Sequence, residues 1–98
     1  MMEVKIADIK PHMHGIEIVA KIISIGPMQT VYTRFGKAEV AQAILSDGKD
    51  TIILNLWRDQ IKMVKIGDTV RIENAFVKEF RGQLELNIGS DGKIIVLK

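Results

Sequence analysis

Hydrophobic and polar residues alternate on either side of Arg81-Gly82, near the C-terminal end of the chain. After this dipeptide, Leu84, Leu86 and Ile88 share one face and polar residues occupy the other, as in a strand with one buried side. A short break containing glycine between two alternating runs is typical of a hairpin. We therefore predict two antiparallel strands joined at Arg81-Gly82.

The run before this turn changes its parity partway along. Val70 and Ile72 share one parity, whereas Ala75 and Val77 share the opposite one. A strand can keep all four side chains inside only if an extra residue enters near Asn74-Ala75. The pattern therefore predicts a β-bulge at that point.

Beyond the expected bulge, two aromatic rings and two cations fall on the outward parity. Phe76, Lys78 and Phe80 point away from the core on this register, and Arg81 follows in the turn. Exposed rings beside positive charges are typical of surfaces that stack nucleic-acid bases and hold their phosphates. We expect such a platform here.

Four more strands are predicted from apolar runs bounded by turn residues: 16–25, 37–46, 51–57 and 93–97. Residues 16–25 are apolar on both parities near their end, so we expect this strand to curl through a barrel and join two sheets. The Asp-Gly within residues 46–50 indicates a hairpin. Residues 89–92 are expected to turn the chain into the last strand.

Residues 4–10 favour a single helical turn with Ile6 and Ile9 on one face. His12 and His14 follow, two positions apart. On a strand they would share a face and bind a metal, but no third ligand lies nearby in the sequence. We expect two solvated loop histidines.

Residues 28–36 are expected to form a loop or an irregular entry to the next strand. Tyr32 and Phe35 bracket Arg34, an arrangement that suits stacking on a base and holding a phosphate. An alternative is that Phe35 folds back as a lid on the end of the barrel.

In residues 51–57, Ile52, Leu54 and Leu56 point inward, which leaves Trp57 on the polar side. An outward tryptophan suits a binding surface, although an edge ring that covers a small apolar patch is the alternative. Residues 58–65 lack turn residues and favour a short helix whose apolar side chains plug the open end of the barrel.

The expected barrel therefore has five strands, with a short helix between the third and fourth, and residues 93–97 add a short strand after the fifth. This order, with a long first strand and a bulged fourth, indicates an all-β OB-fold barrel, which we expect to form one domain over residues 1–98. On an OB fold the second and third strands and the loops after the first and fourth form the oligonucleotide surface. Trp57, Phe76, Phe80 and Arg81 are expected there.

The composition adds limits. The chain has 98 residues, 16 isoleucines, no cysteine and a net charge of +2, which indicates one small β-rich domain without disulfides or thiolate metal sites. The N-terminus lacks the features of a signal peptide, and no apolar run reaches membrane-spanning length, so we expect a cytoplasmic protein without membrane contact. The five aromatic residues are all expected on loops or at outward strand positions. The alternative is that two or three of them fill the core.

Four segments resemble archaeal single-stranded DNA-binding proteins: residues 33–36, 50–57, 66–76 and 80–87. The same domain recurs in archaeal replication protein A. The resemblance implies that Trp57, Phe76 and Phe80 stack bases during DNA replication, repair and recombination. Stand-alone members usually carry a C-terminal tail that this sequence lacks. We therefore expect one domain of a longer replication protein A with further OB domains or subunits as partners, rather than a minimal protein.

The expected activity is binding of single-stranded DNA with low sequence specificity. Arg34, Lys78 and Arg81 are expected to neutralise phosphates, joined by Lys37 and Arg58. Two alternatives stay open: an RNA-binding OB domain, and an OB domain whose aromatics contact another protein.

An enzyme is not expected. Two loop histidines, no cysteine and no clustered carboxylates provide neither a nucleophile with its base nor a metal site. We therefore expect neither catalytic residues nor a cofactor.

Overall fold

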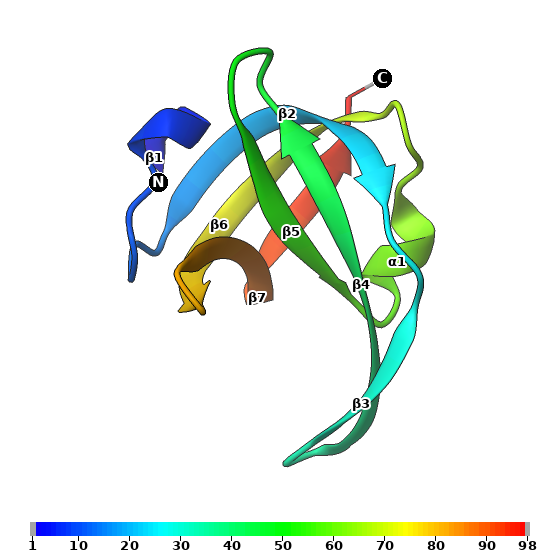
Figure 1. Ribbon diagram of the computed structural model, residues 1–98. Helices are drawn as coiled ribbons and strands as arrows, with labels where there is room; N and C mark the ends of the chain where they lie inside the picture. The colour runs from blue at the N-terminus through cyan, green and yellow to red at the C-terminus, as the bar shows by residue number, and fades with distance from the viewer. Residues whose placement is uncertain (1, 98) are drawn as a thin grey trace.

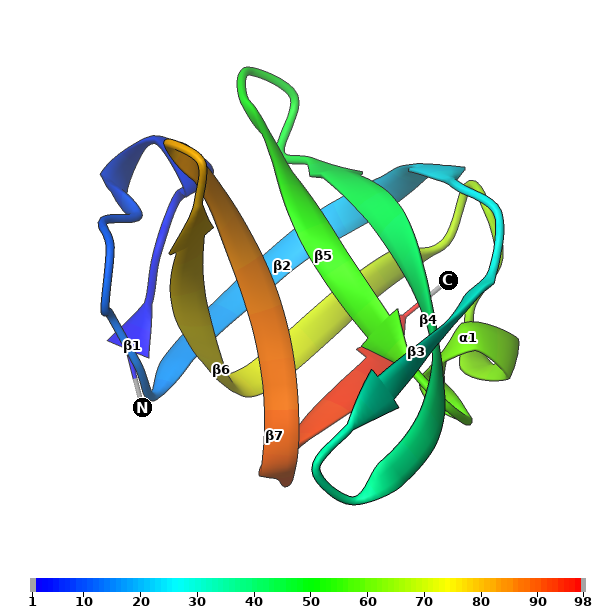
Figure 2. The same ribbon diagram turned by 60° about the horizontal axis from the view of Figure 1, so that its bottom comes forward.

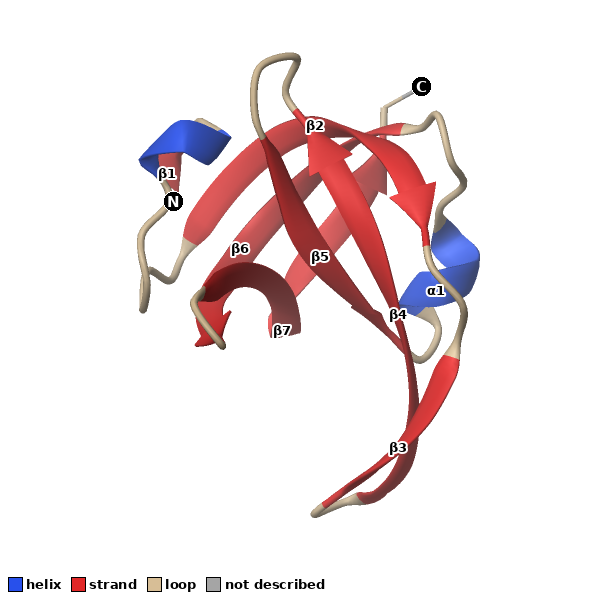
Figure 3. Ribbon diagram, viewed as in Figure 1, coloured by secondary structure: helices blue, strands red, loops and turns tan. Residues whose placement is uncertain are grey.

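Five long strands close into a barrel, and a short strand is added beyond each end of the barrel sheet (Figure 1). The computed structural model describes residues 2–97. The elements are, in chain order, β1 (Met2–Glu3), the 3₁₀ turn η1 (Ile6–Asp8), β2 (Ile16–Ile25), β3 (Gln29–Thr33), β4 (Gly36–Ser46), β5 (Thr51–Trp57), α1 (Gln60–Met63), β6 (Thr69–Phe80) and β7 (Gln83–Val96). Neighbouring strands follow the order β1-β2-β6-β7-β5-β4-β3, and an additional β2–β4 pairing closes the barrel. Figure 3 shows how little of the molecule is helical. The predicted OB fold, with its helix between the third and fourth barrel strands, is confirmed.

Strand β2 joins the two halves of the barrel. Its first half pairs with β6, from Ile16 opposite Ala75 to Lys21 opposite Thr69. Its second half pairs with β4, ending with Ile25 opposite Ala43. The curled first strand expected from its two-sided apolar pattern is therefore confirmed.

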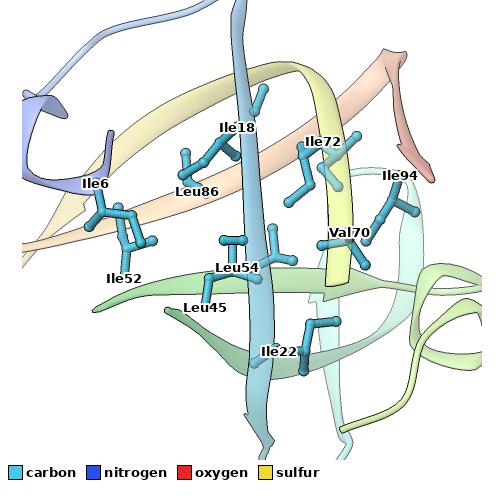
Figure 4. Close-up of a cluster of buried hydrophobic side chains, with 14 of the residues drawn as sticks. Ile6, Ile18, Ile22, Leu45, Ile52, Leu54, Val70, Ile72, Leu86 and Ile94 are labelled. Carbon is cyan, nitrogen blue, oxygen red and sulfur yellow. The ribbon is translucent and has the colours of Figure 1, made fainter. Parts of the chain in front are cut away.

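The core consists of aliphatic side chains from every barrel strand (Figure 4). Ile18, Leu45, Leu54, Ile72 and Leu86 are almost fully buried. No aromatic residue belongs to the buried core of residues 2–97, so the alternative in which rings fill the interior is wrong.

Segments outside the barrel strands cover its two ends. In η1 and just after it, Ile6 and Ile9 are buried, and Ile6 lies beside Ile52 (Figure 4). At the other end the helix is shorter than expected and contains no buried residue. The plug consists of Val64, directly after α1, and of Ile61 in α1, which is partly buried and packs against the core.

The predicted bulge lies in β6 at Asn74, which has a positive φ of 57°. The β6–β7 pairing shifts there, from Glu73 opposite Lys93 to Ala75 opposite Ile88. The turn expected at residues 89–92 does not separate two strands, because β7 runs through this stretch and pairs with β6 on both sides of it. The four residues nevertheless lie opposite Asn74 alone, so the pairing of β7 is irregular there. A Cβ atom at Gly92 would lie 2.8 Å from the Glu73 carbonyl oxygen, so glycine here permits a close strand approach.

Residues 29–33 form a regular strand, contrary to the loop or irregular entry expected there. β3 pairs with β4 from Gln29 opposite Val40 to Thr33 opposite Gly36, and their hairpin projects from the barrel at the bottom of Figure 1. The Thr33 hydroxyl accepts the Phe35 N–H and donates to the Gly36 carbonyl, which stabilises the tip. Phe35 is 84% exposed, so the alternative in which it forms a lid is wrong.

Candidate functional site

A groove of about 750 Å³ runs over the outer side of the barrel between the β3–β4 hairpin and β7. Figure 2 turns the side formed by β4, β5 and β7 toward the viewer, with the hairpin beside it. Outward side chains of β4 and β5 form part of its lining, among them Val40, Gln42, Ile44 and Ile53. The groove is therefore mainly apolar, with polar groups at defined points.

Side-chain hydrogen bonds cross three strands along this surface. The Gln42 Nε2 group donates to Asn55 Oδ1 at 3.2 Å, and Asn55 Nδ2 donates to Glu85 Oε1 at 2.8 Å and Asn87 Oδ1 at 3.4 Å. We call these four residues the amide network. Asn55 and Asn87 are each only 7% exposed, and these bonds compensate for the burial of their polar groups.

The amide network orients Trp57. The indole Nε1–H donates to Asn87 Oδ1 at 3.1 Å, and the Trp57 backbone N–H donates to Gln60 Oε1 at 2.9 Å. The ring is half-buried and lines the groove. Trp57 therefore presents part of its ring to the groove from a fixed position.

The other predicted stacking residues also lie outside the barrel. Phe80 is 59% exposed and lines the groove with Trp57, and Tyr32 lines the hairpin side. Phe76 stands opposite Asn87 in the β6–β7 ladder, and its half-buried ring packs over Gly89. Trp57 and Phe76 therefore lie on the same surface, on either side of Asn87.

The predicted cations lie in three places. Arg81 stands over the Phe80 ring, 5.1 Å from its centroid, and Lys78 is the exposed cross-strand partner of Glu85. Arg34 stands over the ring of its neighbour Phe35 at the hairpin tip, 5.7 Å from the centroid.

Lys37 and Arg58 are separate from the groove. They line a second hollow of about 360 Å³ together with Thr30, Ala38 and Glu39. The structure thus brings Trp57, Phe80 and Tyr32 together in one groove, with Arg81 against it, and leaves Lys37 and Arg58 at another.

The amide network is the part of the site that the sequence pattern did not reveal. Asn55 and Asn87 fall on the outward parity, where polar residues are normally solvated. The signal was the recurrence of amide side chains on the same face of neighbouring strands, at Gln42, Asn55 and Asn87. The alternation of apolar and polar residues shows which face of a strand a residue occupies. It does not show which outward side chains are covered by side chains of neighbouring strands.

Other electrostatic features lie away from the groove. In the β4–β5 turn, the backbone N–H of Asp50, then that of Lys49 and that of Ile6, hold the pKa of Asp47 below its ordinary value of 3.8. Within residues 2–97, no group of three or more His, Cys, Asp or Glu side chains is arranged to hold a metal. Nor does that part of the chain contain a helix long and apolar enough to cross a membrane.

Comparisons with known proteins agree with this geometry. A family model described as single-stranded DNA binding protein Ssb-like, OB fold, matches residues 9–96. The single-stranded DNA binding protein Ssb of Saccharolobus solfataricus is 32% identical over 93 residues. That match covers 95% of this chain, which spans 63% of the length of this relative.

Two solved structures show the same architecture. An OB domain from Thermoplasma acidophilum has a TM-score of 0.84 at 26% identity, covering 100% of this chain and 89% of that one. A domain of replication protein A from Methanococcus maripaludis has a TM-score of 0.74 at 27% identity, covering 97% of each chain.

Proposed function

Because the chain belongs to the family of Ssb-like single-stranded DNA-binding proteins with an OB fold, we propose that it binds single-stranded DNA with low sequence specificity in the groove beside Trp57. The observation that carries this proposal is the pairing of Trp57 and Phe80 on the wall of one groove, with Arg81 over the Phe80 ring. As a member of this family, the chain is a binding protein and not an enzyme.

Stacking supplies the sequence-tolerant part of the proposed binding. Bases would stack on Trp57, Phe80 and Phe76, each worth about 1–3 kcal/mol by alanine substitution. Every base has a π face, so rings of this kind accept any sequence. A duplex buries those faces within its own stack, so it is expected to bind more weakly.

Phosphate neutralisation supplies the electrostatic part. Arg81 and Lys78 stand where they can meet phosphates while the bases stack. A strand that continues along the hairpin would pass Tyr32 and reach Arg34 and Phe35 at the tip. Lys37 and Arg58 would hold phosphates only of a strand that crosses to the second hollow.

The wider roles rest on family resemblance. We propose that the domain acts in DNA replication, repair or recombination, alongside other OB domains or subunits of a replication protein A complex. The resemblance and the 63% span of the Saccharolobus relative support this proposal.

The test uses Trp57, the one tryptophan in the chain. Titration with oligo-dT is expected to quench its fluorescence, and the affinity should fall as salt rises. Phe80→Ala should lower the affinity about tenfold, which corresponds to about 1.4 kcal/mol. Its side chain is exposed, so the urea midpoint should stay close to that of the wild type.

A matched pair of charge variants tests the phosphate contacts. Arg81→Ala should reduce the slope of log affinity against log salt by about 0.7 if it holds one phosphate. Lys62→Ala removes an exposed cation in α1, away from the groove, and should leave that slope unchanged. Unchanged fluorescence and gel mobility with DNA would argue for a protein-contact surface, and tighter binding of matched RNA would argue for an RNA-binding domain.

A further inference from the structure

Within residues 2–97, the groove lining includes one charged side chain, and it is negative. Glu85 lies in β7, half-buried, with its carboxylate joined to Asn55. A carboxylate repels a phosphate, so it is unfavourable as a neighbour of the backbone of a bound strand. The same carboxylate is favourable beside the hydrogen-bond donors on the edge of a base.

The directions of the hydrogen bonds around Glu85 are fixed by two groups, the Glu85 carboxylate, which only accepts, and the Trp57 indole N–H, which only donates. A carboxylate accepts and cannot donate, so Asn55 must turn its NH₂ group toward Glu85. The Trp57 indole donates and cannot accept, so Asn87 must turn its carbonyl toward the ring.

With these directions, the neighbouring Asn55 has no N–H group left for a second bond to Glu85. Both N–H groups of Asn55 are engaged, one by Glu85 and one by Asn87, and its carbonyl accepts from Gln42. Glu85 uses Oε1 for this contact. Its second oxygen, Oε2, has no hydrogen-bond partner among the residues that the structure describes. The groove therefore presents a fixed acceptor at this point.

The cross-strand position of Lys78 defines how a nucleotide would lie. Lys78 stands opposite Glu85 on the same outer face of the β6–β7 ladder, and it is the more exposed of the two. In the proposed binding mode, a phosphate held by the Lys78 ammonium would leave the attached base facing the groove, with its edge toward Glu85. Charge therefore favours the base, and not the backbone, as the neighbour of the carboxylate.

We propose that Glu85 gives one position of the bound strand a preference for bases with an exocyclic amino group, and in particular for cytosine over uracil or thymine. This inference rests on the proposed binding of single-stranded DNA. The cytosine N4 amino group donates to a carboxylate, whereas the carbonyl oxygen at the same ring position of uracil or thymine repels it. Stacking stays tolerant of sequence at the other positions.

The test compares oligo-dC with oligo-dU of equal length at pH 7.5, because the two bases differ at the ring position in question and neither carries a methyl group. The wild-type protein should bind oligo-dC about fivefold more tightly, the ratio to which one net hydrogen bond corresponds. Glu85→Gln keeps the shape of the side chain and the acceptor for Asn55 but removes the charge and can present a donor. In this variant the ratio should fall to about one.

Glu79→Gln is the matched control, since it removes the same charge from an exposed residue of β6 outside the groove lining. It should keep the fivefold ratio. Equal binding of oligo-dC and oligo-dU by the wild-type protein, or an unchanged ratio in Glu85→Gln, would overturn the role of Glu85 and leave the proposed function intact. Failure to bind either oligonucleotide would instead overturn the proposed function.

Discussion

Asn87 is the residue through which the amide network holds Trp57, so its removal tests the site most directly. Asn87→Ala deletes the acceptor for the Trp57 Nε1–H at 3.1 Å and for one Asn55 N–H at 3.4 Å. Asn55 keeps its bond to Glu85 but is only 7% exposed, so water reaches the freed N–H poorly. Trp57 is half-buried, so its freed donor can be partly hydrated.

The magnitude follows from these two losses. One net hydrogen bond contributes about 1 kcal/mol, and a buried donor left without a partner costs about 1–3 kcal/mol. The Asn55 bond is long, so we take the lower end of that range and expect a loss of about 2 kcal/mol in the free energy of unfolding. For a domain of this size that corresponds to a fall in melting temperature of roughly 10 °C.

Urea denaturation followed by Trp57 fluorescence measures the free energy of unfolding. The emission maximum of the folded state reports the environment of the indole ring. Asn87→Ala should lower the urea midpoint and change the emission of the folded protein, and it should weaken oligo-dT binding several-fold because the ring loses its fixed orientation. Gln83→Ala is the control, since Gln83 is an exposed polar residue on the same face of β7. If both variants unfold at the same urea concentration with wild-type emission, the amide network does not orient Trp57.

Two further predictions concern stability away from the groove. Gly92→Ala should lower the free energy of unfolding by about 1–3 kcal/mol, because the new Cβ would meet the Glu73 carbonyl oxygen at 2.8 Å; Gly89→Ala, with its nearest contact at 3.5 Å, should be tolerated, and equal melting temperatures for the two would contradict this reasoning. The lowered pKa of Asp47 means that its contribution to stability is present above its unfolded pKa of 3.8 and is lost as the pH falls through the lower pKa of the folded state. The stability difference between the wild type and Asp47→Ala should therefore shrink on acidification below pH 3.8, and urea titrations that show a constant difference would refute this.

The sequence predicted those parts of the fold that depend on burial. The parity change between Ile72 and Ala75 indicated the bulge, because one face of β6 must stay inside on both sides of it. The two-sided apolar pattern of residues 16–25 indicated a strand that curls through the barrel, and β2 pairs with both β6 and β4.

The parts that the sequence missed depend on contacts between particular residues. β3 buries no side chain, so it lacks the apolar alternation that marks a half-buried strand. The cluster of residues 89–92 suggested a turn into a new strand, whereas β7 continues through it and Gly92 permits the close approach to Glu73. Asn55 and Asn87 are polar and outward-facing, and only the arrangement of β5 and β7 shows that they are covered.

The projecting hairpin constrains where the chain tolerates changes in length. Gln29, Val31 and Thr33 line the groove from one face of β3, whereas Thr30 lines the second hollow from the other, because successive residues of a strand face opposite ways. Tyr32 has the parity of Thr30, yet it also lines the groove. One residue inserted before Thr30 would shift the parity of β3 and exchange the surfaces that Thr30 and Val31 face. Insertions between Thr33 and Gly36 avoid that inversion, so the hairpin can become longer at its tip while both surfaces keep their side chains.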